Sequence, residues 1–140
     1  MDTSKYEVRL TSDSHFSWVR TRLSLERTLM AWLRTAIALI GFGFAIVQFF
    51  ERLSAMEGAK PALYPEAPRY FGLALILSGV IALVLALWQY RWLILYLRGP
   101  VFSPLAGVEE PPIQSPLFVV TIVLAAIGAL AFFAVLFRFA

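Results

Sequence analysis

A row of arginines at a fixed interval is the feature of this sequence with the clearest chemistry. Arg20, Arg27 and Arg34 are seven residues apart, and the same step leads on to Gly41 and Gln48. Seven residues make two helical turns with a drift of only about 20°, so on a helix these residues form one polar line. Guanidinium groups are permanently charged and match phosphate with paired hydrogen bonds. The row therefore predicts an anion-binding helix face, with Arg27 and Arg34 as its main contacts.

Two further lines with the same seven-residue spacing run beside the arginines, one of threonines and one of alanines. Their members are Thr21, Thr28, Thr35, Ala31, Ala38 and Ala45. Arg34 is the only charge in the apolar run 29–50 and is its sixth residue. A charged side chain at that depth in a bilayer costs on the order of 3 kcal/mol or more. Some partner must offset this cost, and its nature bears directly on function.

The composition is that of an integral membrane protein rather than of a soluble domain. The chain has 140 residues, of which 60% are hydrophobic, and a mean hydropathy of +0.76. Its three longest apolar segments are 29–50, 70–90 and 117–137. Each is long enough to cross a bilayer as a helix, which takes about 20 residues. The sequence therefore predicts an all-α integral membrane protein, a bundle of three transmembrane helices.

The remaining segments are predicted to connect these spans or to precede them. The first is expected to contain a cytoplasmic amphipathic helix, capped by Asp13 or Ser14, that runs straight into the first span. The second helix is expected to continue as far as residue 98, where Gly99 and Pro100 end it. The connecting segments are 1–28, the loop 51–69 and the proline-rich loop 99–116.

The distribution of Lys and Arg predicts the orientation of the bundle. Segment 1–28 carries five of them and the second loop region two, against three in the first loop and one at the C-terminus. Cytoplasmic segments of membrane proteins carry the excess of basic residues. The N-terminus and the second loop are therefore expected in the cytoplasm, and the first loop and the C-terminus outside.

Several function classes find no support in the sequence. It has no phosphate-binding loop, zinc-protease helix or nucleophile elbow, and with no cysteine and one histidine it offers no metal site. We interpret His15 as a solvated residue. The consecutive pair Glu109 and Glu110 is interpreted in the same way. The basic residues flank apolar segments, where membrane topology explains them without nucleic acid. We therefore expect no enzyme activity, cofactor, metal or nucleic-acid partner.

Small residues mark the faces on which helices pack, because they let backbones approach closely in lipid. Gly41 and Gly43 lie near the middle of the first span, and Gly72 and Gly79 lie on the second. The pattern fits packing within one chain and packing between subunits equally well.

Antiparallel packing of the first two spans would bring further arginines to the cytoplasmic end of the row. Arg91 and Arg98 close the second helix there, as an outer basic vestibule with Arg20. Glu26 is the only acid nearby, and it would orient Arg27 or pair between subunits. Converging guanidiniums predict a phosphate, polyphosphate or lipid head group as ligand. In a simpler interpretation the arginines anchor the helix to lipid phosphates, with Arg34 reaching the interface.

Residues 26–43, ERTLMAWLRTAIALIGFG, resemble the signature of the YidH-like bacterial inner-membrane proteins, a family of unknown function. That pattern is roughly N-E-R-T-F-L-A-W-[IL]-R-T-[AS], followed by an apolar Gly-rich run. Leu25 replaces its Asn, and Leu29-Met30 replaces Phe-Leu. Tyr90-Arg91-Trp92 is similar to the cluster that closes the family's second span. The resemblance implies three spans in the bacterial inner membrane. The matching residues are Glu26, Arg27, Thr28, Ala31, Trp32, Arg34 and Thr35.

The same domain resembles the membrane part of the vacuolar transporter chaperone, a polyphosphate polymerase whose three-span subunits surround a pore as pentamers. The resemblance implies a homo-oligomer, pentamer favoured, with Glu26 and Arg27 at the pore mouth. Arg34 departs from that branch, which has Asn after Trp-Leu. We therefore expect an oligomeric anion-handling membrane protein, with Gln48 at the far end of its polar line. The alternatives are an accessory or assembly subunit of a larger membrane complex and a protein that binds anionic lipid.

Overall fold

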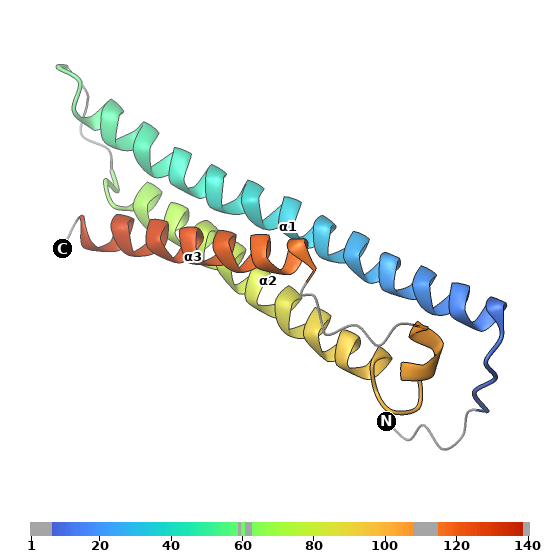
Figure 1. The fold of residues 1–140 in the computed structure, drawn as a ribbon. Helices are drawn as coiled ribbons and strands as arrows, with labels where there is room; N and C mark the ends of the chain where they lie inside the picture. The colour runs from blue at the N-terminus through green and yellow to red at the C-terminus, as the bar shows by residue number, and fades with distance from the viewer. Residues whose placement is uncertain (1–6, 59, 61–62, 108–114, 139–140) are drawn as a thin grey trace.

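The computed structural model describes residues 7–58, 60, 63–107 and 115–138. Three long helices and one short 3₁₀ turn make up this part of the chain (Figure 1). The helices α1 and α2 lie side by side and antiparallel, and α3 lies against the half of the pair that holds the end of α1 and the start of α2 (Figure 1). The elements are α1 (Ser12–Ser54), α2 (Ala67–Leu97), η1 (Ser103–Ala106) and α3 (Pro116–Phe137).

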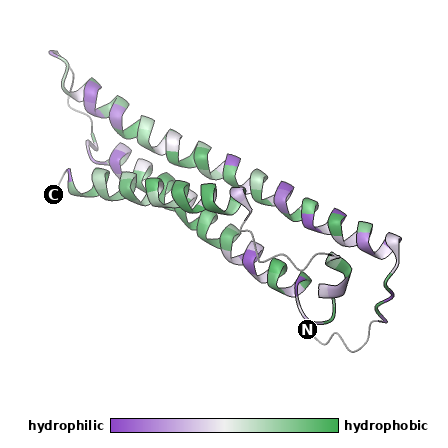
Figure 2. Ribbon diagram, in the orientation of Figure 1, coloured by the Kyte–Doolittle hydropathy of each residue, from purple (hydrophilic) through white to green (hydrophobic). Residues whose placement is uncertain are grey.

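All three long helices are long and apolar enough to cross a membrane, as the sequence predicts. At 1.5 Å per residue α3 is about 33 Å long, close to the thickness of a hydrocarbon core. The helices α1 and α2, at about 65 and 46 Å, extend beyond it. Hydrophobic residues cover α3, whereas hydrophilic ones gather on the part of α1 that α3 does not reach (Figure 2). The chain is a multi-pass membrane protein.

The two long helices keep one register along their whole contact. A Cβ atom added to Gly43 would lie 2.6 Å from the carbonyl oxygen of Gly72. The next contact is seven residues earlier on α1 and seven residues later on α2. There, a Cβ added to Gly79 would lie 2.9 Å from the Ala36 carbonyl oxygen. Nearer the start of α1, the Trp18 indole N–H donates to the Leu97 carbonyl at 3.0 Å. Small residues at the first two crossings therefore bring the backbones together.

Helix α3 fills the groove beside this pair through one small and one polar residue. A Cβ on Gly128 would lie 2.8 Å from Ile40 of α1 and 2.9 Å from Val80 of α2. Thr121 is fully buried, and its hydroxyl donates to the Leu117 carbonyl at 2.7 Å, so it leaves no unsatisfied donor. The Phe118 ring stacks against Tyr90 of α2 with centroids 6.2 Å apart. No passage is left through the centre of this bundle, where Ile76, Leu83 and Thr121 are fully buried.

The observed helix ends differ from some of the predicted ones. Thr11 caps α1 by accepting from the Ser14 N–H at 3.2 Å, so the prediction of Asp13 or Ser14 as the cap is wrong. The N-terminal helical segment is continuous with the rest of α1, which agrees with the predicted extension running straight into the first span. Helix α2 begins at Ala67 and ends at Leu97; a proline fits its first turn, and Pro100, which cannot continue the helix, lies three residues beyond its end. Glu109 and Glu110 lie outside the described residues.

We expect Gly43→Ala to lower the stability of the bundle by about 1–3 kcal/mol, because the new methyl group would collide with the Gly72 carbonyl. Thermal unfolding in detergent would measure the loss. Gly41→Ala is the matched control, since no atom lies within 4 Å of a Cβ at Gly41. Equal effects of the two substitutions would show that close approach at Gly43 does not limit the packing.

Candidate functional site

The side of α1 that faces away from the bundle carries the candidate site. Three adjacent lines of residues, each with seven-residue spacing, form this outer face. The arginine line comprises Arg20, Arg27, Arg34, Gly41 and Gln48; the small line comprises Ser17, Ser24, Ala31, Ala38 and Ala45; the threonine line comprises Thr21, Thr28 and Thr35. Every member is exposed except Gln48, which is half-buried.

The helical period explains why these lines lie away from α2. Leu29, Ala36 and Gly43 are buried at one seven-residue step, and Leu33 and Val47 at another. With about 100° between successive residues, the small line falls opposite this buried seam, with the arginines on one side of it and the threonines on the other. Packing on α2 therefore forces the polar and small residues outward.

The outer face of α1 has an unusual composition for a surface at membrane depth. Most exposed residues of α3 are large and apolar, as lipid contact requires, and they include Val119, Val123, Ile127, Leu130 and Phe133. On α1 the three lines carry charges, hydroxyls and alanines, and exposed apolar residues such as Met30 and Ile37 flank them. A surface of this kind is typical of contact with protein or water rather than with lipid tails.

Arg34 is the costly member of the arginine line. It lies in the apolar part of α1, is exposed, and forms no ion pair with any of the described residues. Its Cβ points toward the start of the helix, so the guanidinium leans toward Arg27 and away from the middle of the span. Snorkelling lowers the cost of the charge but does not remove it. Within the described residues, no carboxylate offsets what remains of this cost.

Each threonine hydroxyl on the outer face is already bonded to its own helix. Thr21 donates to the Ser17 carbonyl at 3.0 Å, Thr28 to Ser24 at 3.0 Å and Thr35 to Ala31 at 3.2 Å. The hydroxyl protons are thereby used, while the oxygen lone pairs still point away from the helix. This line can accept hydrogen bonds but has no donor to offer.

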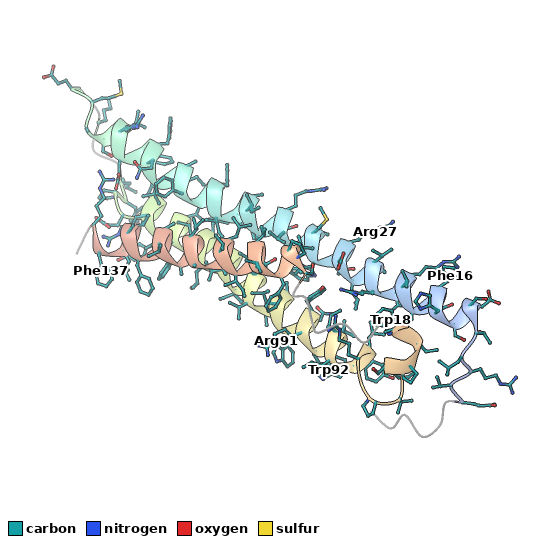
Figure 3. All side chains as sticks on the ribbon, viewed as in Figure 1. Phe16, Trp18, Arg27, Arg91, Trp92 and Phe137 are labelled. Atoms are coloured by element: carbon teal, nitrogen blue, oxygen red, sulfur yellow. The ribbon has the colours of Figure 1, made fainter. Side chains whose placement is uncertain are left out.

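The arginines of α2 do not join this face within one chain. Figure 3 shows Arg27 and Arg91 on opposite sides of the α1–α2 pair. Arg91 is exposed, whereas Arg98 is the half-buried C-cap residue of α2. Glu26 is half-buried beside the seam and pairs with no arginine among the described residues. The predicted convergence of all five guanidiniums would therefore require more than one copy.

The four glycines predicted at packing faces divide into two groups. Gly43, Gly72 and Gly79 are buried at the contact between α1 and α2, so they pack within the chain. Gly41 is exposed, with no atom within 4 Å of a Cβ built on it. Of the four, it alone is available to a neighbour outside the chain.

At the end of the bundle that holds Glu51, a charged cluster joins all three helices, and sequence reasoning missed it. Glu51 of α1 pairs with Arg138 after α3 at 3.6 Å, and Glu66 pairs with Arg69 at 3.3 Å. Arg69 also donates to the Leu136 carbonyl at 3.2 Å. The sequence does contain a signal for this cluster. Acidic and basic residues occur together at the ends of segments that are expected at the same membrane surface.

At the opposite end, hydrogen bonds to backbone carbonyls hold the helices and the second loop together. His15 Nδ1 donates to the Leu105 carbonyl at 2.7 Å, in addition to the Trp18 bond to Leu97. His15 is half-buried, so its interpretation as a solvated residue is wrong. Sequence reasoning could not see this contact because its partner is a loop carbonyl 90 residues away.

The described residues offer no evident metal site. Within that part of the chain, no group of three or more His, Cys, Asp or Glu side chains lies together. A pocket of about 830 Å³ beside Glu51 and Arg138 is an open surface hollow.

Comparison with known proteins assigns the chain to a family. Residues 20–95 match the family described as domain of unknown function DUF202. The chain belongs to the DUF202 family. The match begins at Arg20 and covers the whole arginine line together with most of α2. No curated protein and no solved structure matches the chain.

We expect Trp18→Phe to loosen the end of this DUF202 protein that holds Trp18, because the Leu97 carbonyl would lose its indole donor. Hydrogen exchange in detergent should become about fivefold faster in the last turn of α2, as expected for the loss of about 1 kcal/mol. Trp92→Phe is the control, since Trp92 is exposed on the same helix. Unchanged exchange in Trp18→Phe would show that this bond does not hold the two helices.

Proposed function

We propose that this DUF202 protein is an oligomeric membrane protein that handles a phosphate-like anion through the outer face of α1. The observation that carries the proposal is the exposed arginine line, which enters the apolar span without an acidic partner. Glu26 is the only acidic residue between Asp13 and Glu51, and one carboxylate is too few for three guanidiniums. An anion supplies the missing charge with matching hydrogen-bond geometry.

The proposal requires several copies of the chain. One bundle has its buried side chains at its centre and its arginines on its outside, so it offers an anion no enclosed path. Copies arranged with their outer faces toward a common axis would remove the arginines from lipid and place them around the ligand. Arg27 and Arg34 are the proposed main contacts, with Arg20 in the outer vestibule. Arg91 and Arg98 of the predicted vestibule belong to α2, and Arg91 lies on the other side of the α1–α2 pair from Arg27.

The sequence resemblances support the same arrangement. The YidH-like pattern in residues 26–43 suggests the bacterial inner membrane, and the likeness to the vacuolar transporter chaperone suggests a pentamer around a polyphosphate path. The excess of Lys and Arg in 1–28 supports a cytoplasmic N-terminus and an external C-terminus. On these grounds we infer that the arginine line opens toward the cytoplasm.

A second candidate is a non-conducting accessory or assembly subunit of a larger membrane complex. The small line favours it, because serine and alanine at every seventh position let another helix approach closely. In that case a foreign helix carrying acidic residues would cover the arginines. Such a subunit would be purified at a fixed ratio with its partner, whereas the proposed assembly would be purified as a homo-oligomer.

We expect Arg27→Leu and Arg34→Leu each to reduce phosphate or short-chain polyphosphate flux into proteoliposomes at least tenfold, since each removes a guanidinium from the path. Arg34→Leu should also leave the stability of the bundle equal or higher, because a charge at membrane depth is removed. Arg52→Leu, an exposed arginine beyond the span on the same helix, is the matched control.

Flux and anion binding that survive both substitutions would overturn the site. Anionic lipid that remains bound to the purified protein, with no flux in the unaltered chain, would replace the proposal with lipid binding by the same arginines. Native mass spectrometry with ligands retained separates these outcomes from that of an accessory subunit.

A further inference from the structure

We propose that adjacent copies of this chain meet with the arginine line of one α1 against the threonine line of the next. The partner is thus a second copy of the same chain, in a head-to-tail ring rather than a twofold dimer. The inference rests on the homo-oligomer of the proposed function and deepens it, because it specifies how the arginines are held.

Donor and acceptor capacity on the two lines is complementary. A guanidinium has five N–H donors and no acceptor. The three threonine hydroxyls have used their protons on the carbonyls of Ser17, Ser24 and Ala31, at 3.0, 3.0 and 3.2 Å. Only their acceptor lone pairs remain, so each threonine can accept a hydrogen bond from a guanidinium and has no free donor of its own.

The depths of the two lines in the membrane also match. Each arginine is followed directly by a threonine in the sequence, as Arg20-Thr21, Arg27-Thr28 and Arg34-Thr35. In a ring of parallel copies all chains lie at the same height, so the two members of each pair differ by about 1.5 Å along the axis. Three arginine–threonine contacts can therefore form at once between two neighbours.

The angle between the lines predicts the size of the ring. Successive residues of an α-helix point about 100° apart, so the arginine and threonine lines make that angle around α1. In a closed ring, the directions from one member to its two neighbours differ by about 90° for four copies and about 108° for five. The geometry points to four or five copies, with the small line toward the axis and α2 and α3 outside.

An isolated chain fits the outer face less well than a ring, and a twofold dimer is distinguished from a ring by its size. A parallel twofold contact through the small line would also set arginines beside threonines, but it would close at two chains and leave no axis for an anion, so a cross-linked ladder that ends at two chains would overturn the ring. Exposure to lipid would leave Arg34 without any polar partner. In the ring, a neutral hydroxyl orients each guanidinium without cancelling its charge, which stays available to an anion.

Cysteine cross-linking tests this arrangement, since the chain has no cysteine of its own. The lines continue to Gly41 on the arginine side and Phe42 on the threonine side. Gly41 has no atom within 4 Å of an added Cβ and Phe42 is 62% exposed, so both tolerate substitution without loss of the fold. On one helix the two thiols point about 100° apart and cannot join, so any disulfide links two chains.

We expect membranes containing the double variant Gly41→Cys/Phe42→Cys to give, on oxidation, a ladder of covalent species that ends at four or five chains. Each single variant should give at least tenfold less cross-linked product. Val84→Cys/Leu85→Cys, a pair of adjacent exposed positions on α2, is the control and should remain monomeric. Equal cross-linking of Gly41→Cys alone, or no ladder from the double variant, would overturn the proposed interface.

The hydroxyls can be tested separately. Thr28→Val/Thr35→Val should lower the fraction of intact rings in native mass spectrometry at least tenfold, because the arginines lose their acceptors. Ser78→Ala, which removes a hydroxyl bonded in the same way to the Ala74 carbonyl at 2.7 Å, should not. Intact rings in the threonine variant would contradict the arginine–threonine contact. A ladder without anion flux would support the interface and reject the proposed function. Anion flux without a ladder would support the proposed function and reject the interface.

Discussion

The close antiparallel approach of α1 and α2 is the constraint on which the rest of the structure depends. Backbones meet at Gly43 and Gly72, and again at Ala36 and Gly79, and the register between these crossings leaves no freedom to rotate either helix. Because this contact occupies one side of α1, the arginine, small and threonine lines must lie on the other side. A rotation of α1 that buried Arg34 in the bundle would bring larger side chains to the glycine crossings.

The same constraint sets the energetic problem that the assembly must solve. The bundle stabilises itself through small residues and apolar contacts and uses none of the outer-face polar groups in doing so. Those groups are then available, at membrane depth, to whatever lies outside the chain. The cost of leaving Arg34 in lipid favours any state in which it is covered. In the proposed assembly, relief of this exposure would favour association and anion binding alike.

Much of the fold could be predicted from the sequence because it depends on local signals. Apolar runs of bilayer length predict the three helices, and the seven-residue spacing predicts one polar line on the first of them. Contacts between segments far apart could not be predicted in the same way. Whether Gly43 packs within the chain depends on the register with α2, and the bonds of His15 and Trp18 end on backbone carbonyls, which carry no sequence signal.

The two ends of the bundle are held by different chemistry, and the difference matters for an anion. At the Glu51 end, Arg138 and Arg69 pair with Glu51 and Glu66, so these two charges are compensated within the chain. At the other end, Trp18 and His15 bind uncharged carbonyls, and fastening the helices uses none of the arginine charge. The arginine line is thus free of the contacts that fasten the helices, so an anion bound there as proposed would meet guanidinium charge that no ion pair of the described residues compensates.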